Sequence, residues 1–365
     1  MFKLKQICPT YTDVPRNERR HLSIIFIVIA GIPLLAHSQE SSVVTRQFTN
    51  PIAVGQDPCV VLDGDRFLWC QSDNFQISMH VSNSLSQLGE KHIIWTPPPG
   101  TMYSQEIWAP ELIRIRGRWY IYFAASNGQN KHHRTYVLSA KTSDPLGEYE
   151  FHGPLYTGDE FETKANNFWA IDMTVLEQGD KLFALFSGWT TIDSDVQNLY
   201  IAPMKSPTET SGNRVLISKS DDYLWERVEE RLDTRGLNEG PQILKHDGRT
   251  FVVYSCSASW LPTYKLGLLE WVGDNPLEPT AWKKFSEPVF KSTDSTYGVG
   301  HGSFIQLPAS SQADGKARWW HAYHAKNSRE GGWDRSLFVQ PMSWNSDGTP
   351  NFGKPAKRGA VLTFP

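Results

Sequence analysis

Apolar and polar positions follow one pattern that occurs five times along the chain. In each copy, an apolar run leads into a turn with a glycine and then into a second apolar run rich in aromatic residues. Two short apolar runs joined by such a turn are typical of a hairpin of buried β-strands. No stretch shows sustained helical periodicity, and only the segment 221–233 is a candidate for a short helix. The five turns contain Gly64, Gly117, Gly179, Gly248 and Gly315.

These glycines recur about every 50 to 70 residues, a spacing typical of the blades of a β-propeller. We therefore predict an all-β fold, a five-bladed β-propeller over residues 50–365 with about four strands in each blade. The innermost strand of each blade starts near the central axis, so equivalent residues that are far apart in sequence meet there. The expected result is a central axial active-site pocket.

Three acidic residues stand near the start of these repeats. Asp57 and Asp172 lie seven residues before their turn glycines, and Glu239 lies nine residues before its own. In a propeller their carboxylates would share one pocket, where burial and mutual repulsion raise their pKa values. A carboxyl that keeps its proton can act as an acid while an ionised one acts as a base, which is what glycoside hydrolysis needs. Taken singly, each acid is as well explained by a turn, since Asp before Pro commonly starts one.

The composition of the chain favours some classes of binding partner over others. The chain has 365 residues, a formal net charge of −3 at pH 7 and 12% aromatic residues, among them 14 Trp. A charge so close to neutral gives no reason to expect a nucleic-acid partner. Many Trp and Tyr side chains suit a ligand with flat apolar faces and hydroxyl groups, such as a sugar. Most of the rings are nevertheless expected to pack between the blades.

The N-terminus has the features of a signal peptide. Arg16, Arg19 and Arg20 precede the apolar run LSIIFIVIAGIPLLA, and the small residues Ala36 and Ser38 follow where a signal peptidase cuts. We expect residues 1–38 to be removed and residues 39–49 to form an extended lead-in. The protein would then be secreted and extracellular, without stable membrane association. An uncleaved anchor is the alternative.

Removal of that segment also removes Cys8, so that Cys59, Cys70 and Cys256 remain. An odd number of cysteines cannot be fully paired, and their spacing matches no zinc site. We expect buried thiols, or one disulfide bridge together with one buried thiol.

Several longer motifs carry a family resemblance. The acids lie in QDP (56–58), AIDMTVLE (170–177) and LNEGP (237–241), and EIWAPEL (106–112) stands in the second repeat. The later repeats contain YSCSASWLPTYKLGLLEW (254–271), YGVGHGSF (297–304) and YHAKN (323–327). Together, the motifs and their order resemble glycoside hydrolase family 43, the five-bladed propellers that degrade arabinan and xylan. In detail the chain looks most like the branch of exo-acting α-L-arabinofuranosidases.

The resemblance implies a role for each of the three acids. Asp57 matches the general base that activates water, and Glu239 matches the general acid that protonates the departing glycosidic oxygen. Asp172 matches the residue that orients the acid and tunes its pKa. Enzymes of this family that carry this triad invert the anomeric carbon, which implies a gap of about 6.5–9.5 Å between base and acid.

Four further residues are candidates for the site: His301 and Arg335 through the same resemblance, and Trp108 and Glu111 through their position at the inner end of the second blade. His301 matches an axial histidine and is expected to contact substrate and to help hold a structural calcium ion, with waters completing its shell; a simple hydrogen-bonded histidine is the alternative. Arg335 matches an arginine that binds the terminal sugar, with a surface role as the alternative. Trp108 would wall the sugar subsite or pack against the axis. Glu111 is either a fourth carboxylate of the pocket or part of a structural ion pair.

Two positions depart from the family pattern. Met173 follows Asp172 where Gly is usual, and Val299 stands where Pro is usual. We expect the bulk of Met173 to alter the subsite beside Asp172, which leaves the preferred linkage open.

The function predicted from the sequence is a secreted, inverting glycoside hydrolase that releases terminal L-arabinofuranose from α-1,5-linked arabinan or arabino-oligosaccharides of plant cell walls. We expect a monomer without an organic cofactor. A β-xylosidase or an endo-arabinanase is the alternative within the family. A sugar-binding propeller without turnover is the alternative outside it, but lectin propellers repeat their binding residues in every blade, whereas the five inner positions here differ.

Overall fold

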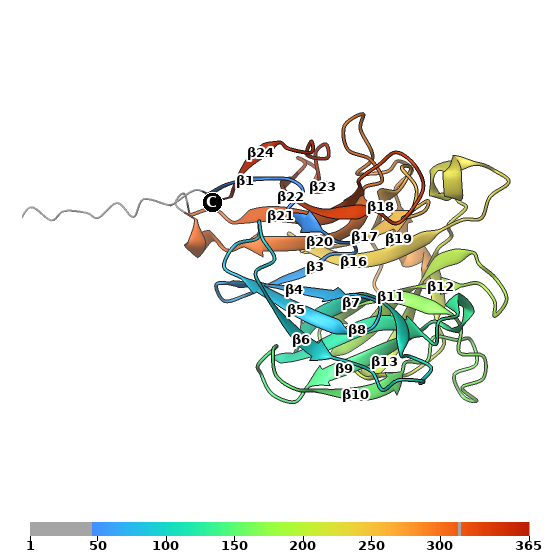
Figure 1. The fold of residues 1–365 in the computed structure, drawn as a ribbon. Helices are drawn as coiled ribbons and strands as arrows, with labels where there is room; N and C mark the ends of the chain where they lie inside the picture. Colours follow the sequence, from blue (N-terminus) through green and yellow to red (C-terminus); the bar gives the residue numbers. More distant parts are fainter. Residues whose placement is uncertain (1–45, 313–314, 365) are drawn as a thin grey trace, which may run out of the picture. The chain divides into compact units, whose positions relative to one another are not determined.

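The computed structural model describes residues 46–312 and 315–364. Five antiparallel sheets, called blades 1 to 5 in chain order, make up most of this part of the chain (Figure 1). The innermost strands of neighbouring blades contact one another in a closed ring, so that the last blade also contacts the first. The five-bladed β-propeller predicted from the repeats is confirmed.

In blades 1 to 4 the strands follow one another from the inner to the outer edge. Blade 1 contains β3 (Cys59–Asp63), β4 (Arg66–Ser72), β5 (Ile77–Ser82) and β6 (Glu90–Trp95). Blade 2 contains β7 (Gln105–Ile115), β8 (Arg118–Ser126), β9 (Arg134–Ala140) and β10 (Tyr149–Pro154). Blade 3 contains β11 (Ala170–Gln178), β12 (Lys181–Trp189) and β13 (Gln197–Ser206), with β14 (Glu209–Thr210) and β15 (Val215–Ser218) both paired to β13. Blade 4 contains β16 (Asn238–His246), β17 (Arg249–Cys256), β18 (Lys265–Trp271) and β19 (Trp282–Lys284).

Blade 5 is closed by a strand from the other end of the chain. It contains β20 (Gly300–Leu307), β21 (Arg318–Lys326), β22 (Arg335–Trp344), β23 (Pro350–Asn351) and the early strand β2 (Ala53–Val54), which pairs with β22. Next to it, β1 (Arg46–Thr49) pairs with β24 (Val361–Phe364), as Figure 1 shows. The side chain of Asn50 adds two hydrogen bonds to the backbone of Val339, at 2.8 and 3.0 Å. The first residues of the propeller therefore cover an edge of the last blade that would otherwise be exposed.

The hairpin turns contain the expected glycines. Gly64, Gly117, Gly179 and Gly248 have φ values of 65°, 85°, 58° and 76°. Only glycine adopts this left-handed region without steric cost, which is why a glycine marks each turn. In blade 5 the two inner strands are joined by a longer connection that contains Gly315, with φ 64°.

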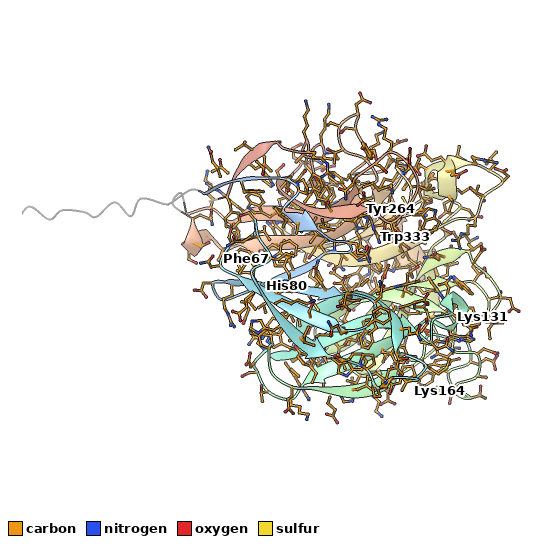
Figure 2. All side chains as sticks on the ribbon, viewed as in Figure 1. Phe67, His80, Lys131, Lys164, Tyr264 and Trp333 are labelled. Carbon is orange, nitrogen blue, oxygen red and sulfur yellow. The ribbon has the colours of Figure 1, made fainter. Side chains whose placement is uncertain are left out.

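The core lies between the blades. Five clusters of buried apolar side chains fill the five interfaces between blades. Phe67, labelled in Figure 2, belongs to the cluster between blades 5 and 1. Trp119, Tyr122, Tyr254 and Phe338 are among the fully buried rings. Since burial of one such side chain contributes about 1.5–3 kcal/mol, these interfaces hold the ring of blades together. Most of the aromatic residues therefore pack between blades, as expected.

The short helix considered for residues 221–233 does not form. That segment contains two separate 3₁₀ turns, η2 (Leu224–Glu226) and η3 (Val228–Glu230), broken at Glu229 by a φ of 57°. The other 3₁₀ turns are η1 (Asn130–His132), η4 (Pro279–Ala281) and η5 (Ala309–Ser311). No helix among the residues with a described placement has the length and apolar character that a membrane crossing requires.

Cys59, Cys70 and Cys256 are buried free thiols, so the alternative of a bridge between two of them is wrong. Cys59 and Cys70 stand opposite each other on β3 and β4 without being joined. The predicted signal peptide, Cys8 and most of the predicted lead-in lie outside the described residues.

Candidate active site

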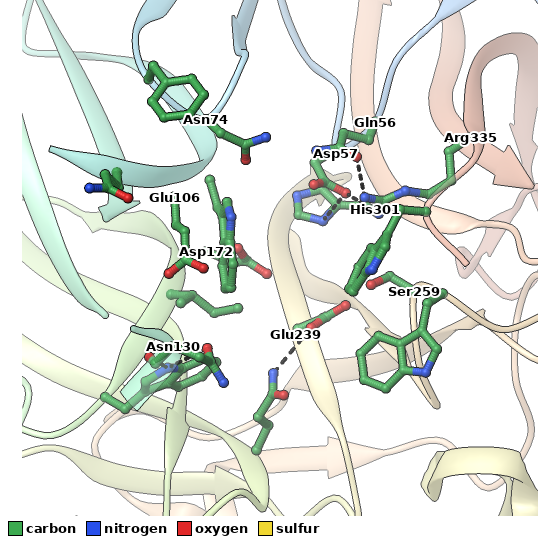
Figure 3. A pocket seen from close by; sticks show the side chains of 18 of the residues that line it. Gln56, Asp57, Asn74, Glu106, Asn130, Asp172, Glu239, Ser259, His301 and Arg335 are labelled. Atoms are coloured by element: carbon green, nitrogen blue, oxygen red, sulfur yellow. Dashed lines mark hydrogen bonds and ion pairs between the residues drawn. The ribbon is translucent and has the colours of Figure 1, made fainter. Parts of the chain in front are cut away.

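A cavity of about 680 Å³ opens where the inner strands begin. All five blades contribute to its lining, and Asp57, Asp172 and Glu239 approach it from different sides (Figure 3). Its lining consists of Gln56, Asp57, Asn74, Phe75, Gln105, Glu106, Trp108, Asn130, Trp169, Ile171, Asp172, Gln197, Arg235, Glu239, Ser259, Trp260, His301, Trp333 and Arg335. The three expected acids therefore line one cavity together with residues from every blade.

An unusual backbone conformation brings side chains from the inner strands into the cavity. Asp57, Ala109, Asp172, Gly240 and His301 have φ values of 45°, 41°, 55°, 57° and 52°, one residue at the equivalent position of each blade. In blades 2 to 5 this residue lies where a β-bulge interrupts the pairing of the inner strand. Such a φ costs about 1–3 kcal/mol for a residue other than glycine and is concentrated at functional sites. The propeller repeats this strained backbone conformation in every blade, and in three of the five blades (Asp57, Asp172 and His301) the residue there is polar and lines the cavity.

Glu239 is not at the same backbone position as the two aspartates. In the pairing of the inner strands, Glu239 faces Ser255 as Ile171 faces Ser187, so that Gly240, not Glu239, is the equivalent of Asp172. The prediction that all three acids occupy matched positions is wrong by one residue in blade 4. A Cβ added at Gly240 would lie 3.1 Å from His301 Nδ1. The glycine thus leaves room for the histidine of the next blade, while the acid enters from the neighbouring position.

Cationic and imidazole groups surround Asp57. Its Oδ1 lies 3.2 Å from Arg335 Nη1, 3.1 Å from His324 Nδ1 and 3.5 Å from His301 Nδ1. Burial by itself would raise the pKa of Asp57, but the charges of Arg335 and His301 and the hydrogen bond to His324 outweigh it and hold the pKa well below its usual range. Asp57 is therefore ionised at neutral and moderately acidic pH, which is the state that a general base requires.

The two other acids have the opposite electrostatic setting. Burial raises the pKa of Asp172 to about 8, and the nearby charges of Glu239 and Asp57 add to this rise, against a lowering by His301. Burial also raises the pKa of Glu239. Because two such carboxyls cannot both ionise easily in one buried space, this pair retains a proton into the neutral pH range.

Hydrogen bonds fix the orientation of this pair. Asp172 Oδ2 accepts the backbone N–H of Gly240 at 3.0 Å, which ties it to the residue beside Glu239. Glu239 Oε1 accepts the hydroxyl of Tyr264 at 2.8 Å, and its Oε2 accepts the amide of Gln197 at 3.2 Å. A tyrosine hydroxyl can donate or accept, so Tyr264 can hold Glu239 in either protonation state.

His301 is a cation on the axis. Burial alone would lower its pKa, but Asp57, Glu111 and Asp172 raise it to about 10. Its Nε2 faces Oε1 of Glu111 at 3.7 Å, and Glu111 is buried and does not line the cavity. Glu111 thus forms the structural ion pair considered in the sequence, and it is not a fourth carboxylate of the pocket.

The residues around His301 do not fit a calcium ion held by protein side chains. A protonated imidazole has no lone pair to offer, and calcium prefers several oxygen ligands. Within residues 46–312 and 315–364, no three His, Cys, Asp or Glu side chains are grouped so that they could hold a metal ion. The calcium ion at His301 stays a prediction, and no step of the chemistry below depends on it.

Arg335 is a buried member of the site, so the surface role considered for it is wrong. Only 5% of its surface is exposed, and besides Asp57 it contacts Gln56 Oε1 through Nη2. Its Nε has no hydrogen-bond partner in the described structure. A guanidinium fixed in this way lines the cavity, where those N–H groups of its two Nη atoms that are not used by Asp57 and Gln56 can donate to a sugar hydroxyl.

Trp108 both lines the cavity and packs against its neighbours. Its ring stacks on the ring of His133 at 3.7 Å between centroids, and it packs against a cluster that contains Trp169 and Ile171. Trp169 in turn stacks on Trp189 at 5.0 Å. Both interpretations of the WAP motif therefore hold, because the packing keeps the ring in place as a wall of the cavity.

A comparison with protein families agrees with this geometry. The model described as "Glycosyl hydrolases family 43" matches residues 48–350. The chain belongs to glycoside hydrolase family 43. The protein is therefore a glycoside hydrolase, and the alternative of a sugar-binding propeller without turnover is not supported.

Relatives within family 43 narrow the comparison. The extracellular exo-α-(1→5)-L-arabinofuranosidase of Streptomyces avermitilis is 30% identical, over 93% of this chain and 70% of that protein. A protein with the same name from Streptomyces chartreusis is 29% identical, over 87% of this chain and 94% of its own length. The crystal structure of an α-L-arabinofuranosidase from Lactobacillus brevis has a TM-score of 0.75 and 32% identity, over 86% of this chain and 98% of that one.

Sequence reasoning missed several residues of the family 43 site. Glu106 lines the cavity from an additional bulge of blade 2, which comes before the one that the other blades share, and its carboxylate accepts the hydroxyl of Ser126. Its place at the start of EIWAPEL, before the second hairpin, was a signal that could have found it. Tyr264 and His324 lie within the motifs 254–271 and 323–327, but nothing there indicated their contacts with the acids. Gln197 lies in none of the motifs. All three reach the acids only across the fold.

Met173 does not shape the subsite as expected. It is fully buried in the core between blades 2 and 3 and is not among the cavity-lining residues. Asp172 and Met173 together form the bulge of β11, and the side chain of Asp172 enters the cavity while that of Met173 enters the core. The presence of Met173, where the family usually has Gly, therefore affects the packing between blades 2 and 3 and not the lining of the cavity.

Proposed function

We propose that the protein is an extracellular, inverting exo-α-L-arabinofuranosidase that removes terminal L-arabinofuranose from α-1,5-linked arabinan or arabino-oligosaccharides. The observation that carries this proposal is the unequal ionisation of three carboxyls in one cavity. Asp57 is held as an anion, and the pair of Asp172 and Glu239 keeps a proton. The names of the relatives from Streptomyces and Lactobacillus support the choice of sugar.

In this mechanism the terminal sugar lies in the cavity between Asp57 and Glu239. Asp57 accepts a proton from a water molecule as the water oxygen bonds to the anomeric carbon. At the same time the bond from that carbon to the glycosidic oxygen breaks, and Glu239 gives its proton to that oxygen. The free sugar leaves with the opposite anomeric configuration, and proton exchange with solvent restores both carboxyls. This route requires about 6.5–9.5 Å between the two carboxyls to admit the water.

Asp172 acts through Glu239 in this scheme, and it is a positioning residue. Its contact with the N–H of Gly240 fixes its position beside Glu239, and the proton that the two carboxyls retain between them keeps an acid available at the start of each cycle. Arg335, Trp108 and Glu106 would bind the sugar, through a guanidinium N–H, a ring face and a carboxylate respectively. An ion pair between His301 and Asp57 also orients the base.

The decisive experiment follows the product by proton NMR from the first turnovers. The purified protein is given linear α-1,5-arabinan, branched arabinan, arabinoxylan and xylobiose in parallel. We expect L-arabinose to appear first as the β-anomer, from linear arabinan and its oligosaccharides. A first product with the α-configuration would contradict inversion. Release of xylose alone, or of oligosaccharides without free arabinose, would replace the proposal with a β-xylosidase or an endo-arabinanase.

The location outside the cell rests on the N-terminal motif and on the word "extracellular" in the names of two relatives. Expression of the full precursor in a bacterial host with signal peptidase should yield a secreted protein that starts at Gln39. An intact N-terminus in a membrane fraction would support the anchored alternative. The expected monomer is checked by size-exclusion chromatography with light scattering.

A further inference from the structure

Two tryptophans form an exposed aromatic surface at the mouth of the cavity. Trp333 and Trp260 both line it, and their ring centroids lie 5.4 Å apart at an interplanar angle of 52°. Trp333 is 63% exposed, and Trp260 is half-buried. The aromatic rings that pack in the core of this protein are buried. An exposed pair of tryptophans beside a cavity is therefore unusual for a role in packing alone.

The fold holds both rings in place although they lie on loops. The backbone N–H of Gly332 donates to the carbonyl of Trp260 at 2.8 Å and so joins the loop before β22 to the loop before β18. The guanidinium of Arg335 lies 5.3 Å from the ring centre of Trp333, and that of Arg235 lies 5.8 Å from the ring centre of Trp260. Such cation–π contacts restrain the rings before any ligand arrives. The surface is therefore organised in advance, which lowers the entropic cost of binding.

The position of this surface relative to the acids indicates what it binds. Asp172 and Glu239 are 4% and 7% exposed, whereas Trp333 is 63% exposed, so the cavity runs from buried carboxyls to an open aromatic mouth. Trp260 belongs to the same loop as Tyr264, whose hydroxyl contacts Glu239. A sugar that reaches the carboxyls must leave the rest of its chain in the mouth, on the side where Glu239 protonates the glycosidic oxygen.

We infer that Trp260 and Trp333 form the subsite for the leaving-group sugar, and that they select a furanose oligosaccharide over a short aglycone. The inference rests on the proposed function. The C–H faces of a sugar ring pack on the electron-rich faces of the two indoles. Ser259 and Arg235, which line the cavity beside them, supply polar groups for the sugar hydroxyls. The two tryptophans thus set which leaving groups are processed well, while the chemistry stays with the carboxyls.

The test compares two substrates that differ only in the leaving group. Arabinotriose places a sugar in the mouth, whereas α-L-arabinofuranosyl fluoride places only a fluoride ion there. We expect Trp333→Ala and Trp260→Ala to lower kcat/KM for arabinotriose about tenfold or more beyond any loss on the fluoride, mainly through KM. Trp333→Phe should restore most of the loss, because it keeps an aromatic face. Ile93→Ala, which changes an exposed apolar residue on the outer strand β6, is the matched control.

The outcomes separate the two proposals. If both alanine variants cleave arabinotriose as well as the parent does, the subsite is wrong and the proposed function stands. If a variant loses activity equally on both substrates, the rings support Arg335 or the acids, and the subsite is again wrong. If the parent releases arabinose from neither substrate, the arabinofuranosidase assignment fails, and the sugar-binding role falls with it.

Discussion

Asp57 and Asp172 are the same residue type in the same backbone setting, yet the protein gives them opposite acidities. Both begin an inner strand with a positive φ, 45° and 55°, and both point into one cavity. Asp57 faces Arg335, His324 and His301, which hold its pKa well below the usual range. Asp172 faces a backbone N–H and two other carboxyls, and burial raises its pKa to about 8. The backbone conformation with positive φ brings each acid into the cavity. The residues that contact it from neighbouring blades then set its pKa and so its chemical role.

The largest expected effect separates the base from the acid. Asp57→Asn should lower kcat on both arabinotriose and arabinofuranosyl fluoride by about 10²–10⁴-fold, because no group remains to accept the proton of water. Glu239→Gln should lose a similar factor on arabinotriose but far less on the fluoride, since fluoride departs without protonation. Steady-state kinetics on the two substrates measures this. Equal losses in both variants on both substrates would mean that the two roles are not divided in this way.

A second test measures stability with the same pair of aspartates. Asp57→Asn breaks a buried ion pair, and we expect it to reduce the free energy of unfolding at pH 7 by about 3–5 kcal/mol. The depressed pKa of Asp57 stabilises the fold above its ordinary pKa, and this contribution disappears as the pH falls toward the folded value. Urea unfolding of the variant and the parent at several pH values gives both numbers. An equally stable variant at pH 7 would show that the ion pair contributes nothing.

Asp172→Asn should change stability in the opposite direction. A raised pKa means that the folded state holds the proton more tightly, so Asp172 destabilises the fold increasingly as the pH rises from about 4 toward 8. The variant has no such cost and keeps an oxygen that can accept the N–H of Gly240. It should therefore have a higher Tm than the parent at pH 8, and the difference should vanish at pH 4. A lower Tm at pH 8 would contradict the assigned pKa.

The pH profile of the parent gives a third test. Because Asp57 stays ionised far into acid, it should cause no loss of kcat/KM above its ordinary pKa. The proton held by Asp172 and Glu239 is lost as the pH rises through about 8, so kcat/KM should fall there. A pH profile of kcat/KM measured between pH 4 and 10 with arabinotriose tests both expectations, the constant activity at acidic pH and the fall near pH 8. A steep fall centred near pH 6 would show that another group limits the reaction.

The smallest expected effect concerns Glu106, an acid that lines the same cavity from a separate bulge of blade 2. Its side chain is 34% exposed and contacts only neutral partners and a distant histidine, so its surroundings resemble neither aspartate. We expect Glu106→Gln to raise KM about two- to tenfold with little change in kcat, the loss of roughly one hydrogen bond of 0.5–1.5 kcal/mol. A large fall in kcat would instead give Glu106 a part in the chemistry.

The local parts of this architecture could be predicted from the sequence. Hairpin strands and their turns depend on alternation and on glycines with positive φ, and both are local properties. Asp57, Asp172 and Glu239 were found because each stands at the start of such a hairpin. Even so, the predicted match of Glu239 with the other two acids was one residue out, because the bulge of blade 4 begins with Gly240. A bulge shifts the position of a side chain without leaving a mark in the apolar pattern.

Contacts between blades could not be predicted from the local sequence pattern. The choice between Glu106 and Glu111 depends on which side of β7 faces the axis after two bulges, and the structure places Glu106 in the cavity and Glu111 against His301. The contacts of Tyr264 and Gln197 with Glu239 join segments that are separated by 25 and 42 residues. Nothing in the local pattern of either segment indicates these partners.

The sequence by itself determined that five hairpins form and that acids stand at the starts of three of them, because strand pairing and turns depend on neighbouring residues. Only the tertiary structure decided which acid is a base and which pair keeps a proton. That outcome depends on Arg335, His301 and His324 being brought against Asp57 from the far end of the chain. Burial and the charges of distant residues set a pKa, and the ring of blades is what brings those residues together.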